Sequence, residues 1–319
     1  MKSVPSMSVK VDQYLKFRRG LGYRLRIEGQ LLQQFGAFAD AVGHKGPLTI
    51  ELALRWARLP KGCDRLYCAR RLEIVRCFAR HLAVTDPKTE IAARNILGPA
   101  HRRMTPFIYA DADVLALVAA ARALSPSKGL RPRTYSTLIG LLACTGLRIS
   151  EALRLARGDA DLGQGLLTIR ETKFRKTRLV PVHATAISAL QVYVRHREQL
   201  VPEPQCDRFF VSQQGLPLPY STVRSVFRKL SGSLRLPKNA ARRRPRLHDL
   251  RHTFACRRIE RWYDERTDLD HAIPALSVYL GHAKVSDTYW YLTATPGLMS
   301  RAAQRFESFA SPLTGEANS

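Results

Sequence analysis

The sequence lacks a long hydrophobic run. Its longest strongly apolar stretch, Leu138–Leu147, is about half the length that a membrane-spanning helix needs. The opening residues, MKSVPSMSVKVDQY, contain no apolar segment of the kind found in secretory signal peptides. The sequence therefore disfavours a membrane protein and a secreted protein, and we expect a cytoplasmic location with no membrane partner.

Cysteine is also scarce, and its spacing does not favour a metal site. The chain has six cysteines, of which Cys63 and Cys68 lie closest together in the sequence. No second pair of cysteine or histidine ligands follows them at the spacing of a zinc site. We expect free thiols in a reducing cytoplasm, no metal and no other cofactor.

Acidic residues are outnumbered. The 319 residues include 52 Lys and Arg against 26 Asp and Glu, which gives a formal net charge of +26. Both parts of the chain contribute, because residues 1–100 carry 18 basic and 8 acidic groups while residues 101–319 carry 34 and 18. The hydrophobic fraction of 45% is that of a folded globular protein. A basic charge spread over folded parts favours a polyanionic partner, and nucleic acid is the first candidate.

The hydrophobic pattern divides the chain into two domains. Residues 1–95 show four or five helical patterns and no strand pattern, which predicts an all-α module. Residues 96–106 contain two X-Pro pairs and several basic side chains, which predicts an extended basic linker. Residues 107–319 combine helical patterns with one hairpin, Leu166–Ile169 and Arg178–Val182 around a basic turn. The predicted fold class is mainly α with a small β-sheet (α+β).

Three local features are expected within the second domain. The stretch Tyr135–Cys144 is apolar on most faces and predicts a buried central helix, which Thr145 and Gly146 end. The acidic stretch Asp264–Asp270 predicts an extra loop. A helix capped by Asp111 is expected to bury Val114, Leu115, Leu117 and Val118.

Four short segments of the second domain supply cations and one phenol. They are Thr145–Glu151, Thr172–Lys176, Leu247–His252 and Leu280–His282, the last followed nine residues later by a tyrosine. The candidate catalytic residues are Arg148, Lys173, His248, Arg251, His282 and Tyr291.

Together these residue types suit cleavage of a phosphodiester without a metal. Two guanidiniums stay charged at any working pH and can hold the non-bridging phosphate oxygens in a bidentate manner. A lysine ammonium can protonate the leaving 5′-oxygen, and a tyrosine can form a covalent ester that is later reversed. Because the ordinary pKa of tyrosine is about 10, neighbouring arginines and imidazoles must help to remove its proton or stabilise the phenolate.

The four segments resemble the tyrosine recombinase (phage integrase) family over most of residues 107–309. The resemblance implies a helical DNA core-binding domain in residues 1–95 and an integrase-like catalytic domain in residues 107–319. The opening Tyr14–Tyr23 is similar to recombinases of bacterial transposon-like elements. By position the resemblance implies Arg148 as the first catalytic arginine, Lys173 as the hairpin lysine, His248 and Arg251 as the His-x-x-Arg pair, His282 as the Leu-Gly-His histidine and Tyr291 as the nucleophile.

The resemblance also implies a function. It predicts a site-specific DNA recombinase that cuts and rejoins DNA through a 3′-phosphotyrosyl intermediate, for integration, excision or transposition of a mobile element. The implied partners are double-stranded recombination sites, further copies of the chain in a tetramer on DNA, and sister recombinases, in association with a bacterial nucleoid. Two alternatives stay open on the residues alone, a type IB topoisomerase and a non-catalytic DNA-binding accessory factor.

Several single residues keep alternative interpretations. Tyr289 is a rival nucleophile, but on a helix it points roughly 200° away from Tyr291, and the family's interval selects Tyr291. Lys176 is a rival for the hairpin lysine on the same turn. Glu151 fits either the orientation of an active-site group or ordinary electrostatics at a helix start. His252 is expected to pack or to cap rather than to catalyse.

Arginines outside these segments are candidates for contacts with DNA phosphates. One group follows the first helical pattern, one lies in the linker, and one precedes the His-x-x-Arg helix. For any single member a solvated charged face is an equally good explanation. The candidates are Arg18, Arg19, Arg24, Arg26, Arg102, Arg103, Arg242, Arg243 and Arg244.

Overall fold

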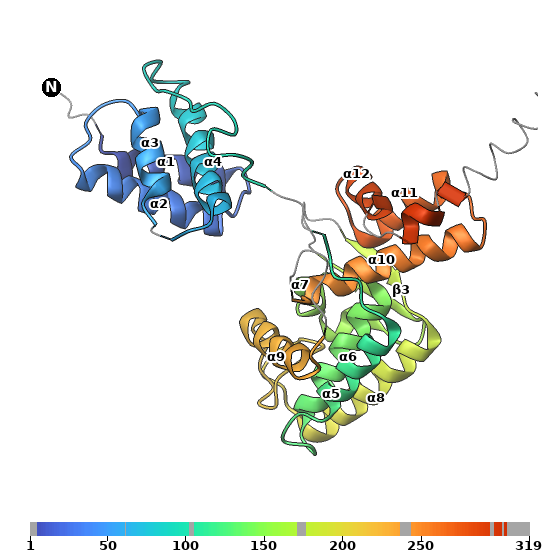
Figure 1. Cartoon of the computed structure of the whole chain (residues 1–319). Helices are drawn as coiled ribbons and strands as arrows, with labels where there is room; N and C mark the ends of the chain where they lie inside the picture. Colours follow the sequence, from blue (N-terminus) through green and yellow to red (C-terminus); the bar gives the residue numbers. More distant parts are fainter. Residues whose placement is uncertain are drawn as a thin grey trace, which may run out of the picture. The chain divides into compact units, whose positions relative to one another are not determined.

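The computed structural model of the chain shows helices and one small sheet (Figure 1). The chain divides into two compact units, Met1–Met104 and Thr105–Ser319. The predicted fold class, mainly α with a small β-sheet, is confirmed. Within the described part of the chain, every helix is too short or too polar to cross a membrane. The structure describes residues 5–60, 62–101, 105–170, 177–236, 244–293, 297–301 and 303–304.

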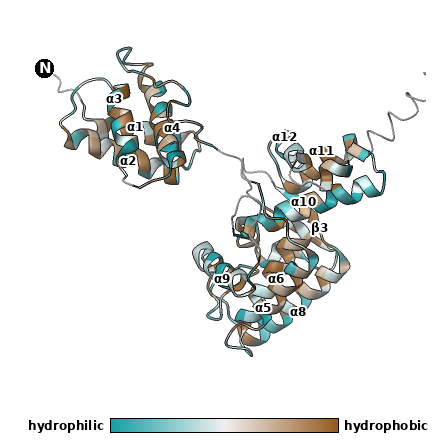
Figure 2. Cartoon of the chain, viewed as in Figure 1, coloured by the Kyte–Doolittle hydropathy of each residue, from teal (hydrophilic) through white to brown (hydrophobic). Residues whose placement is uncertain are grey.

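The N-terminal unit packs its helices around aromatic and aliphatic side chains. Figure 2 shows hydrophobic and hydrophilic residues alternating along these helices, as expected for amphipathic helices around a core. Phe35, Trp56 and Phe78 are at most 1% exposed, and the first two rings meet edge to face. Thr49 caps the third helix, because its Oγ1 accepts from the Leu52 N–H (3.3 Å). The helices are α1 Met7–Gly20, α2 Arg26–Ala41, α3 Ile50–Arg58 and α4 Arg65–Leu82.

The second unit contains the remaining helices and the sheet. Figure 1 shows α5, α6 and α8 together, with α10, α11 and α12 grouped at another part of the unit. The helices are α5 Asp111–Arg122, α6 Leu130–Thr145, α7 Ile149–Ala152, α8 Ala184–Leu200, α9 Tyr220–Ser233, α10 Leu247–Asp264, α11 Leu269–Leu280 and α12 Ser286–Tyr289. The 3-10 turns are η1 Arg157–Asp159 and η3 Trp290–Thr293, and the strands are β1 Ala160–Asp161, β2 Leu166–Ile169 and β3 Arg178–Pro181.

Helix α6 forms the centre of this unit, as the apolar stretch Tyr135–Cys144 predicts. Its inward side chains Tyr135, Leu138 and Leu142 are at most 4% exposed and belong to the main hydrophobic core. The helix ends at Gly146, whose backbone is left-handed (φ +62°). Any Cβ there would lie 2.6 Å from the Phe254 ring, so both the backbone and the packing favour glycine.

The predicted hairpin is present as two antiparallel strands. Residues Leu166–Ile169 pair with Arg178–Pro181, and the short β1 adds a third strand in the order β1-β2-β3. Val180, Leu167 and Ile169 point into the core, as expected for strands with one buried face. The tip of the turn, residues 171–176, lies outside the described residues, and so do the predicted Lys173 and its rival Lys176.

Two local predictions for this unit are wrong. Leu115 is 69% exposed, because it lies two positions from the buried Leu117 and therefore on nearly the opposite side of α5. Helix α5 is preceded by Ala110 as its N-cap residue, so Asp111 is its first residue rather than its cap. The loop predicted at Asp264–Asp270 is present but shorter, because α10 continues to Asp264 and Asp268 caps the start of α11, which leaves residues 265–268 between the two helices.

Candidate active site

Arg148 and Glu151 meet where helix α6 ends and α7 begins. The Arg148 guanidinium donates from Nη1 to Glu151 Oε1 (2.8 Å), and the Arg148 backbone N–H donates to Glu151 Oε2 (3.0 Å). Arg148 Nη2 also donates to the carbonyl oxygen of Gly281 (3.0 Å). The Arg148 side chain nevertheless stays 28% exposed, so part of its guanidinium is accessible to a ligand.

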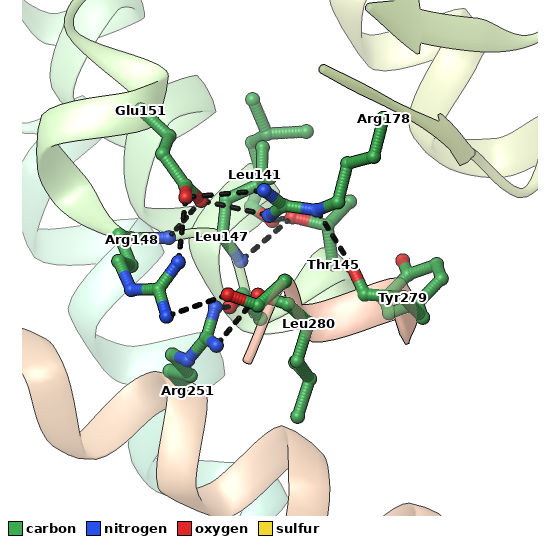
Figure 3. Close-up of polar contacts among 11 residues, drawn as sticks. Leu141, Thr145, Leu147, Arg148, Glu151, Arg178, Arg251, Tyr279 and Leu280 are labelled. Atoms are coloured by element: carbon green, nitrogen blue, oxygen red, sulfur yellow. Dashed lines mark hydrogen bonds and ion pairs between the residues drawn. The ribbon is translucent and has the colours of Figure 1, made fainter. Parts of the chain in front are cut away.

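Arg178, at the start of β3, is a second cation on the same carboxylate (Figure 3). It donates to both oxygens of Glu151, at 2.8 Å and 3.2 Å, and to the carbonyl oxygen of Tyr279 at 2.8 Å. Burial alone would raise the pKa of Glu151, but the hydrogen bonds and charges of Arg178 and Arg148 outweigh it and lower the pKa to about 2. Glu151 is therefore an ionised, buried carboxylate that joins two arginines.

Arg251 lies on α10 and is held by backbone carbonyls rather than by a carboxylate. Nη1 donates to the carbonyl oxygen of Gly146 (2.8 Å) and Nη2 donates to that of Leu280 (2.7 Å). The residue is 2% exposed. Burial, and then the charge of Arg148, lower the pKa of Arg251 to about 10, which still leaves it protonated at neutral pH. These bonds orient the Arg251 guanidinium relative to both α6 and α11.

Tyr291 lies in the 3-10 turn η3, with its phenol close enough to Arg251 for the guanidinium charge to act on it. Its ring stacks on the His282 ring, with centroids 5.9 Å apart and planes at 24°. His282 in turn has Nδ1 2.7 Å from Thr288 Oγ1. Tyr291 is only 3% exposed, and this burial raises the pKa of its phenol although the Arg251 charge acts against the rise. The phenol is therefore protonated at neutral pH and rests against a cation.

Three histidines close to this tyrosine are neutral at pH 7. Burial, and then the Arg251 charge, lower the pKa of His248 and of His282 to about 4, although His248 keeps an exposed face. Burial, and then the charge of His248, lower the pKa of His252 to about 3. The His252 ring meets His248 at 4.7 Å, Trp290 at 5.0 Å and Tyr291 at 5.5 Å, all edge to face. His252 packs, as predicted, and its buried Nδ1 has no hydrogen-bond partner in the described structure.

The structure brings five of the six predicted catalytic residues into one cluster. Tyr291 contacts Arg251 and His282, and the charges of Arg148 and Arg251 both act on His248. The sixth, Lys173, lies outside the described residues, as do the predicted DNA contacts Arg102, Arg103, Arg242 and Arg243. The rival Tyr289 is 48% exposed and lies at the surface.

Sequence reasoning missed Arg178 and left the role of Glu151 undecided. A signal for Arg178 exists, because the period of two in a strand puts it on the same face as the buried Val180. An arginine at such a position needs a buried acceptor. In the folded chain this acceptor is the carboxylate of Glu151. Arg148 is the N-cap residue of α7, and Glu151 lies in the first turn of that helix. Among the described residues, no group of His, Cys, Asp and Glu could hold a metal ion.

A family model for the phage integrase family matches residues 108–297, which contain the whole of this cluster. The chain belongs to the phage integrase family. One relative matches nearly the full length of the chain. It is y4rB of Sinorhizobium fredii, named a putative integrase/recombinase, which is 40% identical over 302 residues, 93% of this chain and 96% of that protein. The tyrosine recombinase XerC of Methylobacterium sp. (strain 4-46) is 34% identical over 238 residues, 74% of this chain and 69% of that protein.

Solved recombinase structures share the fold of this phage integrase family member. The Tn1549 transposon integrase in complex with transposon right end DNA has a TM-score of 0.69 at 16% identity, over 96% of this chain and 100% of that chain. The XerH site-specific recombinase bound to its difH substrate has a TM-score of 0.64 at 21% identity, over 95% and 84%. Taken with the family match and the XerC relatives, the chain is a site-specific tyrosine recombinase.

Proposed function

We propose that this recombinase cuts and rejoins double-stranded DNA through a 3′-phosphotyrosyl intermediate formed by Tyr291. The observation that carries the proposal is the closeness of the Tyr291 side chain to the His282 ring and to the Arg251 charge within one chain. A nucleophile and a phosphate-binding cation of the same protomer are therefore already neighbours. Because Tyr291 is 3% exposed, the residues that cover it have to shift before its oxygen can meet a phosphorus atom.

The proposed cleavage step exchanges one phosphate ester for another. Tyr291 Oη attacks the scissile phosphorus and loses its proton, the new O–P bond forms, and the bond from phosphorus to the 5′-oxygen breaks. Lys173 supplies a proton to the leaving 5′-oxygen, and His248 accepts the phenol proton. The energy of the ester stays in the protein–DNA bond, so that a 5′-hydroxyl can reverse the step.

The electrostatics of the site support these roles. Arg148 and Arg251 carry positive charge toward the cluster, and Arg148 keeps an accessible guanidinium for the non-bridging oxygens. His248 enters the reaction neutral, which is the form that can accept a proton. His282, with Nδ1 beside Thr288, has Nε2 as the nitrogen that can donate to a phosphate oxygen. Each positioned donor is expected to contribute about 2.7–4 kcal/mol to the transition state.

A basic hollow beside the cluster provides a surface for the DNA backbone. It has a volume of about 620 Å³ and lies between α9 and the start of α10, with His248 in its lining. Five arginines line it, which favours a polyanion over any neutral ligand. Arg246 is already paired with Asp249 (2.8 Å), so we assign phosphate contacts to the others. The lining arginines are Arg224, Arg228, Arg235, Arg244 and Arg246.

In the N-terminal unit we propose that the turn between α1 and α2 contacts phosphates. Arg19, Arg24 and Arg26 are exposed there. Arg18 lies instead over the Tyr23 ring, with its guanidinium carbon 4.1 Å from the ring centroid, so its contribution is to hold this turn. Exposed arginines next to an exposed aromatic ring suit a sugar-phosphate backbone.

The biological role that we propose is movement of a mobile element between DNA sites. The relatives named integrase/recombinase, and the Tn1549 transposon integrase as a shared fold, support this role over chromosome maintenance. We further propose that four copies act together on two DNA sites, with or without sister recombinases, in the cytoplasm. The domain boundaries that the sequence predicts, 1–95 and 107–319 around a linker, would let both units contact one duplex.

The test is covalent capture on a nicked suicide duplex made from the boundaries of the element that encodes the chain. We expect an adduct in which the tyrosine is joined to a 3′-phosphate and a labelled 5′-hydroxyl strand is released. Supercoiled plasmid without such a site should stay supercoiled. An absence of any adduct would favour the accessory factor, and relaxation of every plasmid without recombinant products would favour a type IB topoisomerase.

A further inference from the structure

Arg178 joins three parts of the catalytic unit. Its side chain extends from the first residue of β3 to the buried carboxylate of Glu151 and to the Tyr279 carbonyl in the last turn of α11. The side chain is only 10% exposed, and it donates to the Glu151 carboxylate and the Tyr279 carbonyl. Arg178 is therefore placed to orient other residues and not to bind a DNA phosphate itself.

The contact with α11 extends to the residue before His282. A Cβ atom on Gly281 would lie 2.6 Å from Arg178 Nη1, so the guanidinium lies directly against the backbone at this glycine. On the same residue, the Gly281 carbonyl oxygen accepts from Arg148 Nη2 (3.0 Å). Arg178 and Arg148 thus both contact Gly281, and the backbone that carries His282 is held between them.

The charge balance gives Arg178 a second effect. One carboxylate, Glu151, is shared by two guanidiniums, so the group of three keeps a net positive charge. If Arg178 were absent, Arg148 would be the one arginine still paired with Glu151 in the described structure. The negative charge of Glu151 would then cancel the positive charge of Arg148. Arg148 would then attract a phosphate less strongly, even with its own side chain unchanged.

We propose that Arg178 is a positioning residue for strand cleavage, which ties strand β3 to Glu151 and to the end of α11 and thereby fixes Arg148 and His282. The inference rests on the proposed function of the site. Lys173 lies five residues before Arg178, the first residue of β3, in the sequence. The same anchor therefore connects the hairpin with the two groups that we expect to hold the phosphate.

Loss of Arg178 has a pH signature because Glu151 stays buried. The charged and titratable groups that act on Glu151 or adjoin it are Arg148 before α7, Arg251 on α10, Tyr279 on α11, and His282 after α11. Arg178 is one of the two guanidiniums that hydrogen-bond the carboxylate, so its removal raises the pKa of Glu151 toward and above the ordinary range. Glu151 then becomes protonated in mildly acidic solution and no longer holds Arg148 in position, and this loss of position outweighs the charge that Arg148 regains.

The experiment compares Arg178→Met with a matched control, Arg76→Met. Arg76 also forms a bidentate pair, donating to Glu73 at 2.8 Å and 2.6 Å, and is 6% exposed, but it lies in the N-terminal unit. Both variants of the full chain are tested for capture of the nicked suicide duplex from pH 8 to pH 5.5, and for binding of the same duplex. Arg178→Met should slow capture about 100-fold at pH 8 while binding changes less than about threefold.

The ratio of Arg178→Met to wild-type capture should fall further, by about threefold or more, as the pH drops to 5.5. The same ratio for Arg76→Met should be constant. If Arg178→Met does not fold, Arg178→Lys replaces it, with a smaller loss and the same pH trend. The three hydrogen bonds of Arg178 leave from three separate nitrogens, and the single nitrogen of a lysine cannot occupy all three positions.

Two outcomes overturn the inference, and they are distinguishable. If wild-type protein captures DNA and Arg178→Met gives the same capture rate as the control Arg76→Met at every pH, Arg178 has no positioning role. If wild-type protein captures no DNA at all, the proposed function fails and this inference fails with it.

Discussion

The active site consists of two regions that are held together in different ways. In the arginine cluster, directional hydrogen bonds of 2.7–3.2 Å join side chains to one buried carboxylate and to backbone carbonyls. In the aromatic cluster, rings meet at centroid distances of 4.7–5.9 Å, and the buried His252 Nδ1 has no partner in the described structure. The arginine cluster comprises Arg148, Glu151, Arg178 and Arg251, and the aromatic cluster comprises His248, His252, His282, Trp290 and Tyr291.

The difference teaches how a recombinase can combine a fixed phosphate site with a nucleophile that must move. Arg251 is on the 18-residue helix α10 and bonds to the ends of two other helices, so its guanidinium is fixed. Tyr291 is on a four-residue 3-10 turn that follows a four-residue helix, and ring packing tolerates small shifts better than hydrogen bonds do. We infer that DNA binding rearranges the aromatic cluster and leaves the arginine cluster unchanged.

The largest expected effect comes from removing the nucleophilic oxygen. Tyr291→Phe should reduce covalent capture about a millionfold, to below detection, because no other oxygen replaces the phenol. The ring stacking on His282 is retained, so the loss in stability should be at most about 1 kcal/mol, the usual contribution of one hydrogen bond of a buried hydroxyl. Gel analysis of the DNA–protein adduct and urea unfolding measure the two effects.

The matched control is Tyr289→Phe. This change removes the hydroxyl of an exposed tyrosine that lies two residues before Tyr291 in the sequence. It should retain capture on the same nicked duplex. If instead Tyr289→Phe abolishes the adduct and Tyr291→Phe retains it, Tyr289 is the nucleophile and the aromatic cluster is only a packing unit.

The sequence predicts the parts of the site that short motifs encode, and it predicts the fold class because apolar periodicity is strong. His248 and Arg251 are three residues apart on one helix, and Gly146 ends α6 as expected, so these features follow from local rules. The neutral state of the histidines could not be predicted in this way. It depends on burial, to which the rings of η3 contribute by packing on His252, and η3 is distant in sequence from His248 and His252.

The role of Arg178 was hidden for a related reason. Its partner Glu151 is 27 residues earlier in the chain and its carbonyl acceptor on Tyr279 is 101 residues later, so no local spacing connects them. Leu115 shows the opposite failure, since its hydrophobicity suggested burial while its position on α5 puts it in solvent. Periodicity has to be counted around the helix before a single apolar residue is assigned to the core.

A smaller effect separates the two arginines of the phosphate site. Arg251→Ala removes the donor to the Gly146 and Leu280 carbonyls, which should lower the free energy of unfolding by about 2–4 kcal/mol. Arg148→Ala leaves Glu151 paired with Arg178, so the expected loss is about 1 kcal/mol. Both variants should reduce capture about 100- to 1000-fold. Equal losses in urea unfolding would contradict the view that Arg251 is the more firmly built of the two.

The smallest expected effect tests the comparison through pH. The pKa of His252 is about 3 in the folded protein and about 6.5 in the unfolded chain, so the unfolded chain binds more protons between these values. Stability from this residue is therefore complete above pH 6.5 and is lost as the pH falls, by about 2 kcal/mol at pH 5. Glu151 behaves differently, because its pKa of about 2 is below its ordinary value of 4.5, and its contribution is lost only as the pH falls below that value.

Acid should thus weaken the aromatic cluster first. Urea unfolding of wild-type protein at pH 7 and pH 5 gives the total change, and His252→Phe should reduce that change by about 2 kcal/mol because the ring stays while its titration is removed. Glu151→Gln should lower stability at both pH values but leave the difference between them unaltered. If Glu151→Gln changes the difference and His252→Phe does not, the arginine cluster is the acid-sensitive region, and the assignment of rigid and adjustable parts has to be reversed.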